Sequence, residues 1–244
     1  MTVINVVVAG GSGILGSRVV RALLAEGGYQ VSVLSRTDSK NENLDRLSKQ
    51  GAGIIAVDYC RYDDLVRALQ GADILVCVLS HDAATKLQPA LFRAAKEAGV
   101  RRVVPSDYVP DVAELQAATY ENPADGDKPF SAIHEDDLAR FIAVSLKDPH
   151  SKNASFGFES CAITFLQLTA AVERHSGVAL SVTHLLVDPS FSIAYSTADD
   201  VHAAYTFGHE VEMEVQGTSR IDNDRYPSVQ TTSLDAYLAD IFNK

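Results

Sequence analysis

The sequence lacks four features that would each indicate a different class of protein. It has no excess of positive charge: the formal net charge of its 244 residues is −11, so direct binding to nucleic acid is not expected. It has no apolar run of membrane-spanning length and no secretory leader, which predicts a cytoplasmic protein without membrane association. Its three cysteines are far apart, as in a reduced intracellular protein. Its seven histidines show no metal-site spacing, so no metal is expected.

Residues 3–36 carry the pattern that is most informative about function. A β-branched run over 3–8 leads directly into a glycine-rich turn, and an apolar stripe at helical spacing follows over 15–24. A second strand is predicted over 31–34. Strand, glycine turn, helix and strand in this order are typical of a dinucleotide-binding unit. The candidate phosphate-binding residues are Gly10, Gly11, Ser12, Gly13, Ile14, Leu15 and Gly16.

Each spaced glycine of this turn has a distinct expected role. Gly10 allows the tight turn out of the strand, Gly13 allows a pyrophosphate to approach the backbone, and Gly16 allows the helix to pack closely on the sheet. The backbone N–H groups at the start of the helix then face the phosphates, together with the positive end of the helix dipole. The alternative is that the glycines only shape an ordinary strand–helix turn.

The residues after the second strand indicate which nucleotide is preferred. An NAD site usually has an acidic residue here, whereas this chain has Arg36, with Lys40 close behind. A guanidinium suits a 2′-phosphate and offers little to a bare ribose. The sequence therefore predicts NADP(H), the alternative being that Arg36 is a solvated loop charge.

The alternation of strands and helices continues beyond the first unit. It predicts a Rossmann-like α/β fold with a doubly wound parallel sheet, in which ligands lie beyond the carboxyl ends of the strands. Asp58, Ser80 and Ser106 follow three of these strands and are candidates for cofactor contact, or else polar caps of the strand ends. The expected elements are strands at 54–57, 74–79 and 102–105, a helix capped by Asp63 and closed by Gly71, and a helix over 88–98.

The second half of the chain shows a weaker pattern. We expect helices over 134–146, from Thr164 to 175–177, and over 233–242, with a short strand at 155–160 and an extended segment at 180–187. The cluster His134-Glu135-Asp136-Asp137 could be an acid–base site, but a solvent-facing helix start is the simpler interpretation because acidic residues favour that end of a helix.

Several motifs together resemble the NmrA-like and isoflavone-reductase-like family, which are atypical short-chain dehydrogenases. The matching segments are the glycine turn 10–16, Leu34-Ser35-Arg36, Asp58 with residues 65–71, residues 102–108 and residues 226–238. The turn after the fifth strand and the C-terminal segment are more specific than the glycine turn. The resemblance implies an NADP-binding domain over 1–108 and a small, shortened substrate region over 109–244.

The chain departs from this family after the fifth strand. The resemblance implies a helix there with a catalytic lysine, followed by a further strand and a substrate-pocket loop, yet residues 109–127 are too few to contain them. No lysine lies between Lys96 and Lys128, and no tyrosine is followed by lysine four residues on. The sequence therefore assigns no catalytic residue, and either an internal deletion or a lost exon accounts for the gap.

These observations favour an NADP(H)-dependent oxidoreductase of secondary metabolism. Its substrate would be a small organic metabolite, possibly aromatic or an enone. One alternative is a non-catalytic redox sensor that binds NADP(H) and acts through a regulatory protein partner. Another is a truncated product without stable function. The sequence leaves the oligomeric state open.

Overall fold

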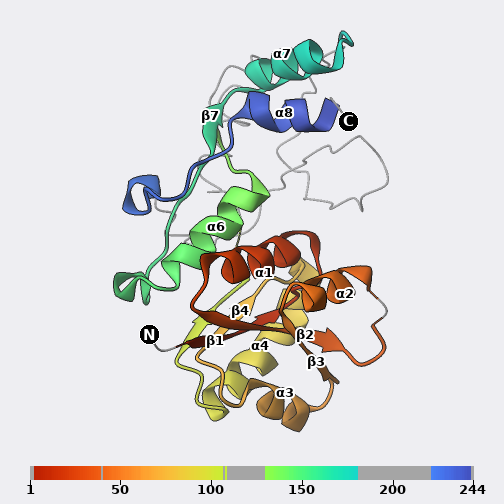
Figure 1. Cartoon of the computed structure of the whole chain (residues 1–244), viewed down its shortest axis with the longest axis vertical. Helices are drawn as coiled ribbons and strands as arrows, with labels where there is room; N and C mark the ends of the chain where they lie inside the picture. The colour runs from red at the N-terminus through yellow and green to blue at the C-terminus, as the bar shows by residue number, and fades with distance from the viewer. Residues whose placement is uncertain (1–2, 40, 107, 109–129, 181–220, 243–244) are drawn as a thin grey trace, which may run out of the picture. The chain divides into compact units, whose positions relative to one another are not determined.

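Five parallel strands form the central sheet of the protein (Figure 1). The computed structural model describes residues 3–39, 41–106, 108, 130–180 and 221–242. The strands are β1 (Ile4–Ala9), β2 (Tyr29–Arg36), β3 (Gly53–Val57), β4 (Ile74–Cys77) and β5 (Arg102–Val104). Their spatial order is β3-β2-β1-β4-β5, and every neighbouring pair is parallel. This order confirms the expected Rossmann-like, doubly wound sheet.

Helices cover both faces of this sheet, which explains why β4 is apolar throughout and β1 is apolar and buried over residues 6–9. Figure 1 shows α1 (Ile14–Glu26) and α2 (Glu42–Lys49) on one face, and α3 (Tyr62–Leu69) and α4 (His81–Glu97) on the other. Within β1, Val6 and Val8 pack in the same apolar cluster as α1, whereas Val7 packs with α3 and α4. A buried parallel strand needs apolar residues at every position because both of its faces are covered.

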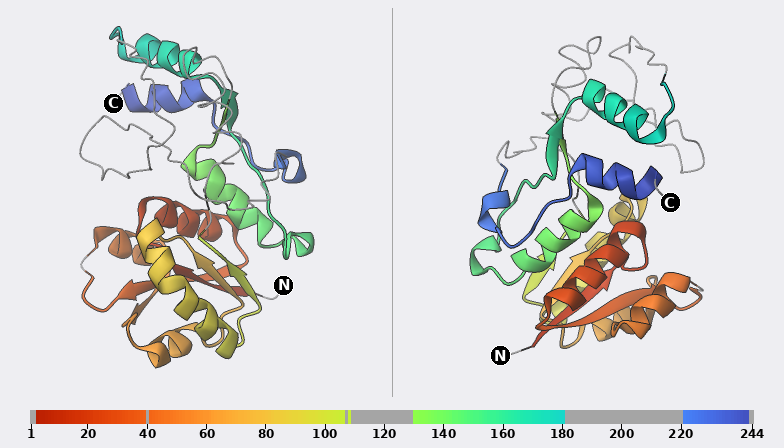
Figure 2. Two further views of the ribbon diagram at one scale, coloured as in Figure 1. Left: turned by 180° about the vertical axis from the view of Figure 1, so that it is seen from behind. Right: turned by 45° about the horizontal axis from the view of Figure 1, so that its top comes forward.

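The chain forms two compact units, which differ in extent from the expected division at residue 108. One comprises Met1–Val109, Ile133–Ser160 and Arg220–Thr232, and the other comprises Pro110–Ala132, Cys161–Ser219 and Ser233–Lys244. Residues of the second half of the chain therefore complete the sheet-containing unit. In particular, α6 (Glu135–Ser145) packs beside α1, as both views of Figure 2 show.

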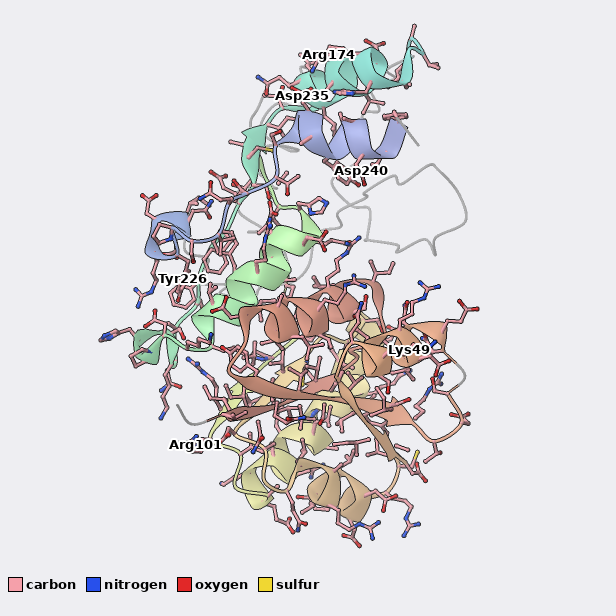
Figure 3. All side chains as sticks on the ribbon, in the orientation of Figure 1. Lys49, Arg101, Arg174, Tyr226, Asp235 and Asp240 are labelled. Carbon is pink, nitrogen blue, oxygen red and sulfur yellow. The ribbon has the colours of Figure 1, made fainter. Side chains whose placement is uncertain are left out.

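Arg18 and an aromatic cluster stabilise this part of the sheet-containing unit. The Arg18 guanidinium on α1 bonds the carboxylates of Glu135 and Asp136 at 2.8 and 2.7 Å. The aromatic cluster contains Phe141, Phe156, Phe158 and Tyr226, whose rings stack or meet edge to face (Tyr226 is labelled in Figure 3).

The second unit contains a two-stranded antiparallel sheet and two packed helices. Its strands are β6 (Phe130–Ala132) and β7 (Cys161–Ile163), and its helices are α7 (Phe165–Ser176) and α8 (Leu234–Phe242). The Thr164 and Gln167 side chains form a reciprocal capping box at the start of α7, which confirms the expected cap. Of the helices that the structure describes, none is long and apolar enough to cross a membrane.

Some predicted element boundaries were wrong. Helix α4 begins at His81 and not at residue 88. Proline is usually found in the first turn of a helix, but Pro89 lies inside this one. Helix α3 is preceded by Arg61, so Asp63 lies in its first turn and is not its cap. The strand expected at 155–160 forms only an isolated bridge at Gly157, and β7 follows it.

Among the described residues, two short 3-10 helices, Pro149–Ser151 and Asn223–Arg225, were not predicted, and neither were one α-helix and one strand. The α-helix is α2 and the strand is β6, although α2 carries a clear start signal in the Asn41 side chain, which accepts a hydrogen bond from Asn43 N–H. Most of the expected extended segment at 180–187 lies outside the described residues.

Candidate nucleotide-binding site

The turn between β1 and α1 needs glycine at two positions for reasons internal to the fold. Gly10 has a φ of +83°, and a Cβ atom there would lie 2.0 Å from the carbonyl oxygen of Val78. A Cβ atom on Gly16 would lie 2.1 Å from the carbonyl oxygen of Gly10. Neither overlap can be relieved by moving a flexible side chain, since both oxygens belong to the backbone. Gly10 and Gly16 therefore have the turn and packing roles that the sequence predicted.

Gly13 is different, because the protein itself does not require a glycine there. Its φ of −73° and ψ of 177° are accessible to any residue. The nearest atom to an added Cβ would be the carbonyl oxygen of Gly10, at an ordinary contact distance of 3.4 Å. The space in front of Gly13 is thus open. A side chain at this position would obstruct the approach of a ligand but would not clash with the protein. Gly11 is intermediate, since a Cβ atom there would meet Val33 at 2.9 Å.

The N-terminus of α1 is suited to binding an anion. Gly13 precedes the helix and has no side chain to cap it, and the first turn contains no acidic residue. The N–H groups of Ile14, Leu15 and Gly16 have no acceptor among the described residues, as expected for the first turn of a helix. Ile14 is 73% exposed. These uncapped donors and the helix dipole favour a negatively charged ligand.

The other described helices have either an acidic residue or a capping box at the N-terminus. An acidic residue occurs in the first turn of α2, α3, α4, α6 and α8, where its charge already balances the helix dipole. Helix α7 has no such residue, but its capping box satisfies the N-terminal donors. Among these helices α1 therefore keeps the strongest uncompensated attraction for phosphate.

Arg36 lies at the same edge of the sheet as the glycine turn. It is the last residue of β2, and its side chain is exposed. It pairs in register with Val57, the last residue of β3, so Asp58 follows directly beside it. No acidic side chain in the described ranges forms an ion pair with the Arg36 guanidinium, which leaves its charge available to a ligand. Lys40, the second basic candidate, lies outside the described residues.

Tyr59 follows Asp58 and packs against the apolar cluster that includes Leu34 of β2. Burial raises the pKa of its phenol to about 12, although the nearby Arg36 charge opposes the shift. Its hydroxyl donates to the Leu34 carbonyl at 3.4 Å. Tyr59 is therefore a neutral structural side chain at physiological pH and not a general base.

The structure assigns different surroundings to the three polar candidates at the strand ends. Asp58 accepts a hydrogen bond from Cys60 N–H at 2.9 Å through one carboxylate oxygen. Ser80 precedes α4 and does not cap it with its side chain, so its hydroxyl stays available for a ligand. Ser106 is committed to the protein: its hydroxyl donates to the Leu79 carbonyl at 2.8 Å and accepts from Leu79 N–H at 2.9 Å. Ser106 thus joins the ends of β4 and β5, while its role toward a cofactor stays a prediction.

The acidic cluster does start α6, and Glu135 and Asp136 are about half exposed as expected, but the solvent-facing interpretation was wrong for Asp137. The Asp137 side chain is fully buried. It accepts hydrogen bonds from the Ser160 hydroxyl at 2.5 Å and from Thr232 N–H at 2.6 Å, and it also pairs with Arg140. Burial raises the pKa of Asp137, but these hydrogen bonds outweigh it and lower the pKa below its usual range. The cluster therefore stabilises structure.

No catalytic group can be assigned from the described residues. Lys128 and residues 109–127 lie outside them, and Tyr108 packs against the apolar cluster that includes α1. The described ranges contain no group of three or more potential metal ligands. In the second unit, Arg174 on α7 is paired with Asp235 on α8 at 2.7 Å (both labelled in Figure 3), so its charge is already balanced.

Comparisons with known proteins show the family and the fold of the chain. The model of the NmrA-like family matches residues 3–124. A bifunctional pinoresinol–lariciresinol reductase of Linum usitatissimum is 26% identical over 307 residues, covering 96% of this chain and 97% of the relative. Bifunctional pinoresinol–lariciresinol reductase 1 of the same plant is 36% identical over 46% of this chain, which spans only 38% of that relative.

A solved structure extends the likeness to the fold. The apo form of AtPrR2 is 24% identical and has a TM-score of 0.72, with 98% of this chain and 99% of that chain covered. AtPrR2 has also been solved with NADP+ and (+)pinoresinol. The 307 residues aligned to the first reductase exceed the 244 of this chain by 63, so at least that many residues of the relative have no counterpart here. This agrees with the expected shortening, while its position after the fifth strand stays a prediction.

Proposed function

The chain belongs to the NmrA-like family, and we propose that it is an NADP(H)-dependent oxidoreductase that reduces a small organic metabolite. The observation that carries the proposal is the uncapped N-terminus of α1 behind Gly13, together with the exposed Arg36 at the same sheet edge. Pinoresinol–lariciresinol reductases among the relatives support a phenolic substrate with an aromatic ring. The chain does not span the full length of most of these relatives, so its substrate is part of the proposal.

The chain's own residues would bind and orient the cofactor. The N–H groups of Ile14, Leu15 and Gly16 would bind the pyrophosphate, and Arg36 would pair with the 2′-phosphate. Ser80 would contact the nicotinamide ribose at the end of β4, and Ser106 would hold that end in place. Bound NADPH supplies a hydride to the substrate, and the accompanying proton must come from a protein group or from water.

Arg36→Asp tests the preference for the phosphorylated cofactor. We expect the unsubstituted protein to bind NADPH at least about tenfold more tightly than NADH, a difference of about 1.4 kcal/mol, because only NADPH offers a partner to the guanidinium. The substitution should abolish or invert this ratio in a calorimetric titration. Arg67, exposed on α3 and paired with Asp64, provides the control: Arg67→Gln removes the same charge and should leave the ratio unchanged. Equal affinities for the two cofactors in the unsubstituted protein would contradict the assignment.

Turnover tests the catalytic half of the proposal. General acid–base assistance is worth roughly 10²–10⁴ in rate, and the chain has no lysine where the family resemblance implies one. We therefore expect NADPH binding with slow reduction of phenolic or enone substrates, followed at the NADPH absorbance. Lys128→Ala should change the residual rate by less than about threefold. Rapid turnover that is lost in Lys128→Ala would show that this lysine has the catalytic role.

The same measurements distinguish the enzyme from a regulatory protein. A protein that binds NADPH tightly, oxidises none in the presence of candidate substrates and retains a protein partner in a pull-down would be a redox sensor. Sequencing the transcript across codons 108–128 would show whether an exon that encodes a lysine is missing from this chain.

A further inference from the structure

Asn43 on α2 contacts the glycine turn from a distance of 31 residues along the sequence. Its side-chain amide donates a hydrogen bond to the carbonyl oxygen of Ser12 at 3.1 Å. Its backbone N–H is used separately, because it donates to the Asn41 side chain at 2.9 Å and so caps α2. The side-chain amide is therefore not required for the helix start, and its partner lies in the candidate phosphate site.

This contact completes a clamp on the Ser12–Gly13 peptide group. The carbonyl of that peptide accepts from Asn43, and the N–H of the same peptide donates to the Gly10 carbonyl at 3.1 Å. Rotation of this peptide plane would break both hydrogen bonds, so together they favour the observed orientation. A flipped peptide would turn the Ser12 carbonyl oxygen toward the space in front of Gly13, where its partial negative charge would repel a phosphate.

We infer that Asn43 is a positioning residue for the cofactor, which fixes the orientation of the Ser12–Gly13 peptide so that the N-terminus of α1 faces the pyrophosphate. The inference rests on the proposed function, because it assumes that a dinucleotide binds at this turn. Asn43 follows Arg36 and Lys40 along the chain, so it also links the segment that would contact the 2′-phosphate to the loop that would contact the pyrophosphate.

The test compares ligands with and without the pyrophosphate. Asn43→Ala should weaken NADPH and NADH equally, by about threefold to tenfold, as expected for the loss of one neutral hydrogen bond. Asn43→Asp should weaken both further, since a carboxylate would repel the Ser12 carbonyl. Adenosine 2′-monophosphate carries the 2′-phosphate without the pyrophosphate, and its affinity should not change in Asn43→Ala.

Two controls separate positioning from a general structural role. Glu42→Gln alters the preceding residue, whose side chain is 86% exposed, and should leave all three affinities unchanged. Asn43→Gln keeps an amide donor and should recover part of the lost affinity. The denaturation midpoints of the Asn43 variants should lie close to that of the unsubstituted protein, so that the change is confined to binding.

The other outcomes overturn the inference in distinguishable ways. Unchanged NADPH affinity in Asn43→Ala would show that the clamp is dispensable, while the proposed function would stand. A selective loss of adenosine 2′-monophosphate and NADPH affinity would show that Asn43 contacts the 2′-phosphate directly. Failure of the unsubstituted protein to bind either dinucleotide would overturn the proposed function itself.

Discussion

Gly13→Val is expected to abolish NADPH binding and leave the protein folded. The added side chain would occupy the open space in front of α1, where the proposed pyrophosphate approaches the free N–H groups. We expect affinity to fall at least about 100-fold, equivalent to about 2.7 kcal/mol. The free energy of unfolding should fall by no more than about 1 kcal/mol, because the backbone angles suit valine and no protein atom blocks its Cβ. Calorimetric titration and chemical denaturation measure the two effects separately.

Gly16→Ala is the matched contrast to this variant. A single methyl group there would overlap the Gly10 carbonyl, so the variant should lose stability even before ligand is added. Gly13→Ala should fold normally and show an intermediate loss of NADPH affinity. Normal NADPH binding by Gly13→Val would mean that the phosphates lie elsewhere.

Asp137→Ala is expected to lower stability by about 3 kcal/mol. The substitution removes a buried carboxylate and leaves the Ser160 hydroxyl and Thr232 N–H without their acceptor. For a chain of this size the melting temperature should fall by roughly 6–12 °C. Asp136 provides the control, since its carboxylate is 50% exposed and paired with Arg18. Asp136→Asn should cost at most about 1 kcal/mol.

The pH dependence of the Asp137 effect has a defined sign. The pKa of Asp137 is lowered in the folded state, so its stabilising contribution is complete above the unfolded-state pKa of about 3.9. The contribution is lost as the pH falls through the lower folded-state pKa. The stability difference between the unsubstituted protein and Asp137→Asn should therefore be constant near neutral pH and shrink below about pH 4. A difference that grows on acidification would contradict the ion-pair geometry.

The N-terminal half could be predicted from the sequence because its signals are local. The run at 3–8, the spaced glycines and the apolar stripe over 15–24 each specify their own element. Parallel strands joined by helices then have few possible topologies, and the observed order is the common one. The errors in this half include the omission of α2 and the wrong start of α4, where packing keeps Pro89 inside the helix although local preference would place it in the first turn.

The second half was less predictable because its structure depends on distant contacts. The local pattern of acidic residues at 135–137 predicts only a helix N-terminus, yet the three side chains have different surroundings. Asp136 binds Arg18, 118 residues away, and Asp137 binds Thr232, 95 residues away. Nothing in the local pattern distinguishes the exposed carboxylate from the buried one.

The sequence by itself determined the parallel α/β fold, the family and the position of the glycine turn, because these follow from local patterns of glycine and apolar residues. Only the tertiary structure separated the glycine that is free to face a ligand, Gly13, from those required by the fold, Gly10 and Gly16. It also brought Asn43 to the Ser12 carbonyl and buried Asp137. Such distinctions depend on which backbone and side-chain atoms meet across the fold, and residues far apart in sequence meet only once the chain has folded.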